Sequence, residues 1–112
     1  MSHSFLSQSF SPNDLARLLG QTNIQPGPLH GVWFMNGRPD LPCHIWHGSG
    51  PLGIMVIENE NYDRVVGQLM LSTITVPHWN NLQGLYIDNY KAIFWANGSY
   101  WTREPRQPGL QY

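Results

Sequence analysis

The sequence predicts a mainly β fold: a small antiparallel meander β-barrel of about seven or eight short strands with one N-terminal helix. From His30 onward, short runs of strand-favouring residues follow one another at regular spacing, separated by Gly, Pro, Asn and Asp turn signals. Several runs carry apolar side chains at both odd and even positions, which indicates that both of their faces are covered. All runs can be joined by hairpins, and closure into a barrel removes exposed sheet edges.

The chain of 112 residues is predicted to form a single domain over residues 1–112. We expect the N-terminal helix at about 12–19, the β-barrel at about 30–104 and a loose tail at 105–112. The first ten residues have no basic start and no continuous apolar run, and no stretch is long enough to cross a bilayer. We therefore expect a soluble, cytoplasmic protein with no membrane partner.

The helix is predicted by the residues that begin and end it. Ser11 is a suitable N-cap, Pro12 fits the first helical position, and Asp14 places a carboxylate beside the free N–H groups. Phe10 can form a hydrophobic staple with Leu15. An apolar stripe and a stop signal complete the pattern, namely Leu15, Leu18, Leu19 and Gly20. We expect this helix to plug the sheet or to flank it.

The predicted strands cover residues 31–35, 43–47, 52–58, 64 to about 76, 82–88, 92–96 and 99–103. The run at 52–58 is apolar on both faces, so we expect it to be central or covered on both sides. The long run from Arg64 is interrupted at Gly67 and around Ser72, where a bend or bulge is expected.

The last two strands flank Asn97-Gly98, which is the strongest short-range signal for a two-residue hairpin with a type I′ turn. That turn pairs Trp95 with Tyr100 and Phe94 with Trp101. Trp95 and Tyr100 then lie on one face, and Phe94 and Trp101 lie on the other. Since both faces carry aromatic rings, one is expected to meet the core and the other a ligand, a partner or a second sheet.

Charge argues against several classes of partner. Only 12% of the residues are charged and the formal net charge is −1, so we expect no nucleic-acid partner and no anionic membrane surface. Cys43 is the single cysteine, which excludes an intrachain disulfide.

The titratable residues do not form a recognisable catalytic or metal-binding motif. His44 and His47 point to opposite faces if residues 43–47 form a strand, and the same holds for Cys43 and His44. A structural or surface role is expected for the histidines, and no metal or other cofactor is expected. The carboxylates at predicted turns and strand ends act as an acid–base pair only if two of them converge in a pocket: Asp40, Glu58, Glu60, Asp63 and Asp88.

Three features follow one another along the chain, namely a short helix, Gly31-Val32-Trp33 in the first strand, and Arg103 at the end of the last strand. The order of these features resembles the calycin architecture of lipocalin-like barrels. The resemblance implies that Arg103 packs across the Trp33 ring and closes one end of the barrel. Such a cation–π contact contributes roughly 0.5–2 kcal/mol. The resemblance concerns the fold and does not identify a function.

The five tryptophans carry the functional interpretation. They indicate either a Trp-rich core or an aromatic-lined cavity or groove that suits a neutral small molecule, an apolar metabolite or a saccharide. The candidate ligand-binding residues are Trp33, Trp46, Tyr86, Trp95, Tyr100 and Trp101. Two other hypotheses stay open. One is a small-barrel cyclase, isomerase or hydrolase that uses a pocket His or carboxylate. The other is a homo-oligomer whose aromatic face is the subunit interface.

Overall fold

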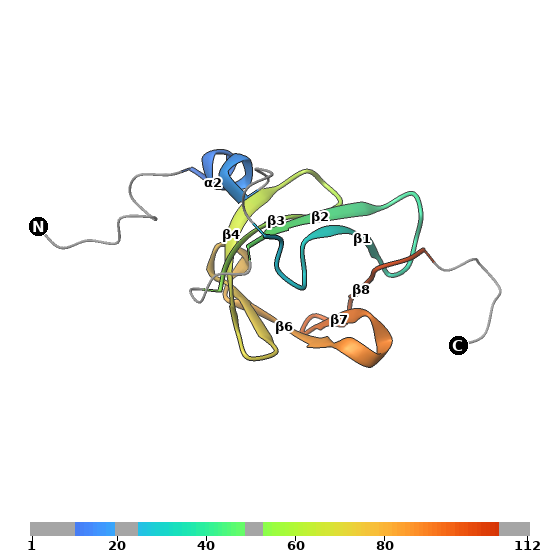
Figure 1. The fold of residues 1–112 in the computed structure, drawn as a ribbon. Helices are drawn as coiled ribbons and strands as arrows, with labels where there is room; N and C mark the ends of the chain where they lie inside the picture. Colours follow the sequence, from blue (N-terminus) through green and yellow to red (C-terminus); the bar gives the residue numbers. More distant parts are fainter. Residues whose placement is uncertain (1–10, 20–24, 49–52, 106–112) are drawn as a thin grey trace, which may run out of the picture.

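The computed structural model describes residues 11–19, 25–48 and 53–105 and contains a closed barrel of eight antiparallel strands (Figure 1). Each strand pairs with the next, and the last pairs with the first. The strands are β1 (Gly31–Met35), β2 (Pro42–His47), β3 (Ile54–Glu58), β4 (Arg64–Met70), β5 (Thr73–Val76), β6 (Leu82–Ile87), β7 (Ala92–Trp95) and β8 (Tyr100–Thr102). The predicted fold class is confirmed.

In the described parts of the chain, three short helices accompany the strands. Helix α2 (Pro12–Leu19) precedes the barrel, η1 (Pro77–Trp79) joins β5 to β6, and η2 (Asp88–Tyr90) joins β6 to β7. Among the described residues, no helix has the length and apolar character that a membrane crossing requires. The predicted tail beyond residue 105 lies outside the described residues.

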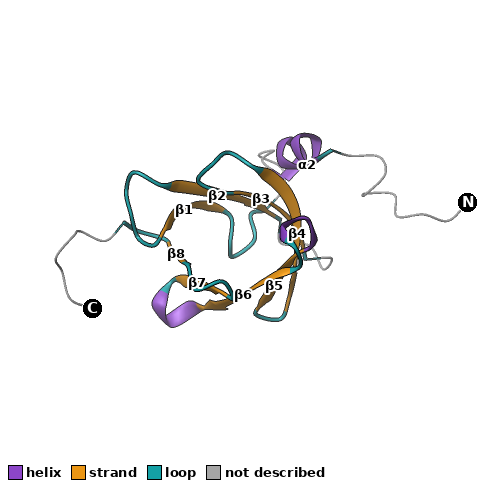
Figure 2. Cartoon of the chain, turned by 180° about the vertical axis from the view of Figure 1, so that it is seen from behind, coloured by secondary structure: helices purple, strands orange, loops and turns teal. Residues whose placement is uncertain are grey.

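Helix α2 begins as its sequence predicts. The Asp14 N–H donates to the Ser11 hydroxyl at 3.2 Å, and the Ser11 N–H donates to the Asp14 carboxylate at 3.5 Å. The predicted staple residue Phe10 and the stop residue Gly20 lie outside the described residues. The helix flanks the barrel on the outside of β3 and β4 (Figure 2).

The buried face of α2 differs slightly from the predicted stripe. Leu15 and Ala16 are buried against Val56, and Leu19 packs against the same cluster, whereas Leu18 does not belong to it. Val56 points outward from β3 while its neighbours Met55 and Ile57 point into the barrel. The helix therefore covers the outer face of β3, which explains why that strand is apolar at every position from Ile54 to Ile57.

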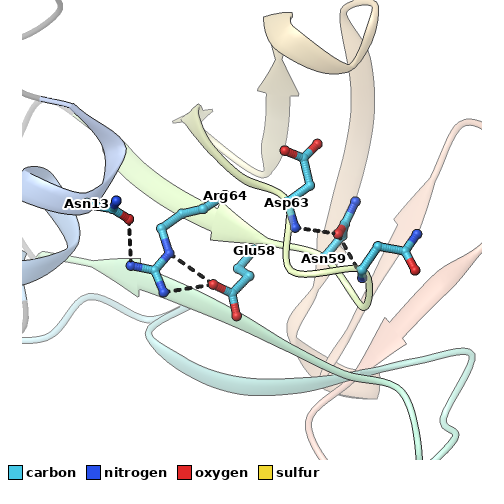
Figure 3. Close-up of polar contacts among 6 residues, drawn as sticks. Asn13, Glu58, Asn59, Asp63 and Arg64 are labelled. Atoms are coloured by element: carbon cyan, nitrogen blue, oxygen red, sulfur yellow. Dashed lines mark hydrogen bonds and ion pairs between the residues drawn. The ribbon is translucent and has the colours of Figure 1, made fainter.

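Arg64 connects this helix to the barrel wall (Figure 3). Its guanidinium bonds to the Glu58 carboxylate through Nε at 2.9 Å and Nη2 at 2.8 Å, and Nη1 donates to Asn13 Oδ1 of the first helical turn at 2.9 Å. The same group lies 4.4 Å from the ring centroid of Trp46. These contacts orient α2 on β2, β3 and β4.

The interior of the barrel is filled by its own side chains. An eight-stranded barrel has an interior just wide enough for this. The inward side chains with no exposed surface include Trp33, Ile45, Met55, Ile57, Ile74, Val76 and Ile93.

The long predicted run from Arg64 to Val76 is two strands, not one. β4 and β5 form a hairpin around Leu71 and Ser72, and Leu71 has a φ of +57°. The interruption expected around Ser72 is therefore a hairpin turn and not a bend or bulge, and it contains a leucine at a positive φ, which leucine rarely adopts. Gly67 does not interrupt β4; a Cβ there would lie 2.7 Å from Ile57 Cδ1, so the glycine makes room for a core side chain.

The predicted type I′ turn at Asn97-Gly98 is wrong. The Trp95 N–H donates to Ser99 O at 2.9 Å and the Gly98 N–H donates to Trp95 O at 3.0 Å, which defines a three-residue loop. Gly98 has a φ of +93°, whereas Asn97 is not at positive φ, as in a type I turn followed by a left-handed glycine.

The longer loop shifts the pairing of the last two strands by one residue. Phe94 pairs with Tyr100, and Ile93 pairs with Trp101. A shift of one residue moves a side chain to the opposite face of a strand. Trp101 therefore lies on the inner face beside Trp95, and not on the opposite face as the sequence analysis expected.

Candidate functional site

The two ends of the barrel differ in how their polar groups are satisfied. We call the first the closed end; it consists of residues 26–30 with Trp33 and Arg103. The Trp33 indole N–H donates to Leu29 O at 2.9 Å, and the Arg103 guanidinium lies 4.3 Å from the Trp33 ring centroid. Arg103 also donates to Pro28 O at 2.8 Å. The expected contact between Trp33 and Arg103 is thus present.

Two histidines hold residues 26–30 against the barrel. Nδ1 of His47 accepts the Leu29 N–H at 3.3 Å, and Nδ1 of His30 accepts the His47 N–H at 2.9 Å. The Gly27 N–H donates to His47 O at 2.7 Å. Burial, with a smaller effect from His30, lowers the pKa of His47. Because a ring nitrogen that accepts an N–H carries no proton, His47 performs this structural role in its neutral form.

A hollow of about 640 Å³ lies outside the closed end, beside Tyr86, Asp88, Lys91 and Arg103. The Tyr86 hydroxyl donates to the Asp88 carboxylate at 2.7 Å, and the Lys91 ammonium lies 3.3 Å from the same oxygen. Burial and this hydrogen bond raise the pKa of Tyr86, and the same bond lowers the pKa of Asp88. Tyr86, Asp88 and Lys91 are paired with one another, and Arg103 is bonded to Pro28 O, so this hollow is the weaker candidate in spite of its larger volume.

The opposite end, which we call the open mouth, is a hollow of about 410 Å³. It lies where β1, β3, β5 and β7 end and where the strands that follow them begin. Its lining combines indole rings, amides and a single carboxylate: Met35, Asn59, Glu60, Trp79, Asn80, Leu82, Trp95, Asn97, Ser99 and Trp101.

Three tryptophans form the apolar part of the open mouth. The ring centroids of Trp95 and Trp101 are 5.2 Å apart at 67°, and those of Trp79 and Trp95 are 6.5 Å apart at 71°. Such edge-to-face pairs are favourable because the positive edge of one ring meets the negative face of the next. A Cβ on Gly84 would lie 2.6 Å from Trp95 Cε3, so this glycine admits the Trp95 ring. Trp79 is half-buried and gives the cluster its exposed surface.

The indole nitrogen of Trp95 is the unusual atom of the open mouth. Trp95 is only 4% exposed, and its Nε1 is buried without a hydrogen-bond partner in the part of the chain that the structure describes. By contrast, the Trp79 indole donates to the Asp63 carboxylate at 2.8 Å. A buried donor left unpaired costs about 1–3 kcal/mol, so it marks a place where a water or a ligand acceptor is expected.

The asparagines of the rim have defined orientations. Asn59 Oδ1 accepts the N–H groups of Asn61 and Asp63 at 2.9 and 3.0 Å (Figure 3). Asn97 Oδ1 accepts the N–H and the hydroxyl of Ser99 at 3.0 and 2.6 Å. Since the oxygens are used by the turns themselves, each side-chain NH₂ group remains a double donor with no recorded partner among the described residues.

Glu60 is the charged side chain of the open mouth. Among the described lining residues it has no basic neighbour, so the site disfavours anions. The Cys43 thiol points toward its carboxylate at 4.0 Å. Burial first, and then the charge of Glu60, raise the pKa of Cys43 to about 12. Cys43 therefore stays a thiol at neutral pH and is not an activated nucleophile.

The structure brings two of the six predicted ligand-binding residues, Trp95 and Trp101, together at the open mouth. Trp33, which is fully buried at the closed end, and Tyr86, which lines the other hollow, pack edge to face with ring centroids 6.2 Å apart. The remaining two lie on the outside of the barrel, since Trp46 stacks on His44 at 4.2 Å and Tyr100 pairs with Phe94.

The sequence analysis missed Trp79, Asn59 and Asn97 as lining residues and treated Glu60 only as a turn carboxylate. All of them lie in or next to turns. Because the turns between strands surround the mouth of a barrel, their position in turns was the signal that could have identified them as lining residues.

The remaining titratable residues do not assemble into a second chemical centre. In the described residues, no group of three or more His, Cys, Asp or Glu side chains lies close enough together to hold a metal ion. Comparison of the chain with protein-family models, curated proteins and solved structures gave no match. The function is therefore argued from the geometry of the open mouth.

Proposed function

We propose that this protein is a non-catalytic binding protein for a neutral small molecule, an apolar metabolite or a saccharide, which it holds in the open mouth against Trp79, Trp95 and Trp101. The single observation that carries the proposal is the unpartnered, buried indole N–H of Trp95 next to a Trp-lined hollow. Ligand sites typically combine an apolar lining with a few polar groups that fix orientation.

The site lies at the mouth and not in the barrel interior. The interior positions are occupied by side chains with no exposed surface, such as Trp33, Ile57 and Ile93. The contact between Trp33 and Arg103 supports the resemblance to calycins at the closed end. The packed interior argues that any ligand binds outside the barrel core.

Binding is expected to move the tryptophan cluster. Nε1 of Trp95 has no exposed surface, so a ligand oxygen reaches it only if a neighbouring side chain shifts, and Trp79 and Trp101 are aromatic neighbours of the Trp95 ring. Trp79 is the half-buried tryptophan of this cluster, so its movement loses the fewest packing contacts.

Tryptophan fluorescence and equilibrium dialysis test the proposal with two neutral compounds, cellohexaose and N-phenyl-1-naphthylamine. We expect at least one of them to bind, and Trp79→Ala to weaken that binding by about 1–2 kcal/mol, as for an aromatic anchor. Trp46→Ala is the matched control, because Trp46 is also half-buried but lies outside the barrel. If neither compound and none of the neutral hexasaccharides named in the next subsection binds, or if Trp46→Ala weakens binding as much as Trp79→Ala, the proposed function is wrong.

A further inference from the structure

Resting on the proposed function, we infer that the ligand class of the open mouth is a neutral saccharide and not an apolar metabolite. The inference depends on the hydrogen-bond donors and acceptors around Trp79. A site for an apolar ligand would need only the tryptophan cluster and would not need these polar groups. They are the Glu60 carboxylate, the NH₂ groups of Asn59 and Asn97, and the indole N–H of Trp95.

The polar rim matches hydroxyl groups better than hydrocarbon. A sugar hydroxyl donates one hydrogen bond and accepts others, so it can bond to a carboxylate and to an amide NH₂ at the same time. Glu60 supplies an acceptor with two oxygens, and Asn59 and Asn97 supply donors whose orientation their turns already fix. An apolar ligand would remove these groups from water without replacing their hydrogen bonds, which is unfavourable.

The apolar part of the open mouth suits one face of a pyranose ring. The C–H groups of such a ring form an apolar face that packs on an indole through many small dispersion contacts. Trp79 offers the exposed surface for this contact, and the Asp63 carboxylate holds its N–H at 2.8 Å. Trp95 and Trp101 support it from the barrel side at edge-to-face angles.

The charge of the site selects neutral sugars. Glu60 is the charged group among the described lining residues, and no Lys, Arg or His stands beside it in the open mouth. A uronic acid would place a second carboxylate near Glu60, which is unfavourable in a partly desolvated site. We therefore expect discrimination between neutral and acidic oligosaccharides of the same length.

Isothermal titration calorimetry tests the inference with hexamers of cellulose, xylan, chitin, mannan and amylose, with hexagalacturonate and with N-phenyl-1-naphthylamine. We expect at least one neutral hexamer to bind and hexagalacturonate to bind at least tenfold more weakly. Glu60→Gln, which keeps the size of the side chain, should weaken binding of the neutral hexamer about tenfold. It should change binding of N-phenyl-1-naphthylamine less than twofold. Glu104→Gln, at the hollow outside the closed end, is the control and should change neither.

The outcomes separate the two proposals. Binding of N-phenyl-1-naphthylamine that depends on Trp79, without binding of any neutral hexamer, overturns the saccharide inference and leaves the proposed function standing. Absence of binding of every compound overturns both. A neutral hexamer whose affinity is the same for the wild type, Glu60→Gln and Trp79→Ala also overturns the inference, because its site then lies elsewhere.

Discussion

The two ends of the barrel use tryptophan in opposite ways. At the closed end, Trp33 has no exposed surface, its N–H is bonded to Leu29 O, and Arg103 covers its ring. At the open mouth, the Trp95 N–H is buried and unpartnered among the described residues, and the rings beside it are other tryptophans. Within the described part of the chain, a tryptophan N–H thus has a hydrogen-bond partner at the closed end, in Trp33, and lacks one beside the hollow of the open mouth, in Trp95. This difference is consistent with a structural role for the closed end, and it is the reason why the proposed ligand site is placed at the open mouth.

The largest expected effect is on stability at the closed end. Trp33→Ala should lower the free energy of unfolding by about 3–5 kcal/mol, because it removes a fully buried ring together with its hydrogen bond and its cation–π contact. Trp79→Ala should cost less because Trp79 is only half-buried. Urea denaturation followed by circular dichroism measures both. An equal or larger loss for Trp79→Ala would contradict the distinction between the two ends.

Two glycines provide a second comparison of the ends. Gly31 has a φ of +126°, and a Cβ there would lie 2.7 Å from Nη1 of Arg103. Gly98, in the loop at the open mouth, has a φ of +93° and no atom within 4 Å of such a Cβ. Gly31→Ala should therefore cost more than about 2 kcal/mol, from strain and overpacking together, and Gly98→Ala about 1 kcal/mol from strain alone. Thermal unfolding of the two variants tests the order, and the reverse order would contradict the described contact with Arg103.

Acid should weaken the closed end through His47. Its pKa is lowered in the folded state, so the unfolded state binds a proton more readily. Its contribution to stability is complete above the unfolded pKa of about 6.5 and is lost as the pH falls below that value. The slope from this one proton is at most about 1.4 kcal/mol per pH unit. Urea denaturation between pH 7.5 and 5 measures it.

The matched variant is His47→Asn, because the amide oxygen can accept the Leu29 N–H in place of Nδ1 without titrating. It should reduce the pH dependence of stability, and the remainder should come partly from His44, whose pKa is also lowered by burial. His78→Asn, at an exposed position of η1, should leave that dependence as it is in the wild type. An unchanged slope in His47→Asn would show that His47 is not the group responsible.

The smallest effect concerns Cys43 beneath the open mouth. Its buried thiol has a pKa raised to about 12, so labelling by a disulfide reagent at pH 8 should be slow in the folded protein and fast in urea. Glu60→Gln removes the nearby negative charge and should increase the labelling rate of the folded protein. Rapid labelling of the wild type would contradict both the burial of this thiol and its position next to Glu60.

Much of the fold follows from local sequence signals. The capped helix at Pro12–Leu19, the first strand at Gly31–Met35 and the double-sided burial of β3 were all predictable, because caps, turn residues and hydrophobic patterns are local. An interruption around Ser72 was predicted, but the hairpin that forms there was not, since leucine rarely adopts the positive φ of Leu71. The resemblance to calycins supplied the pairing of Trp33 with Arg103, which are far apart in the chain.

The candidate site was less predictable than the fold. Asn97-Gly98 favours a two-residue turn, but the chain forms a three-residue loop, and that single residue decides whether Trp101 faces inward beside Trp95. Trp79, Glu60 and Asn59 meet at the open mouth only because barrel closure brings separate turns together. No spacing within the sequence encodes that convergence.

The central claim is that a ligand meets the tryptophans of the open mouth and leaves those of the closed end unchanged. The five indole N–H signals of the ¹⁵N-labelled protein test it directly, once they are assigned with single Trp→Phe variants. On titration with the tightest-binding neutral hexasaccharide, we expect the signals of Trp79, Trp95 and Trp101 to shift, the Trp95 signal most strongly, as its N–H gains a partner. The signals of Trp33 and Trp46 should stay in place. A shift of Trp33 or Trp46 with Trp95 unmoved would contradict the account.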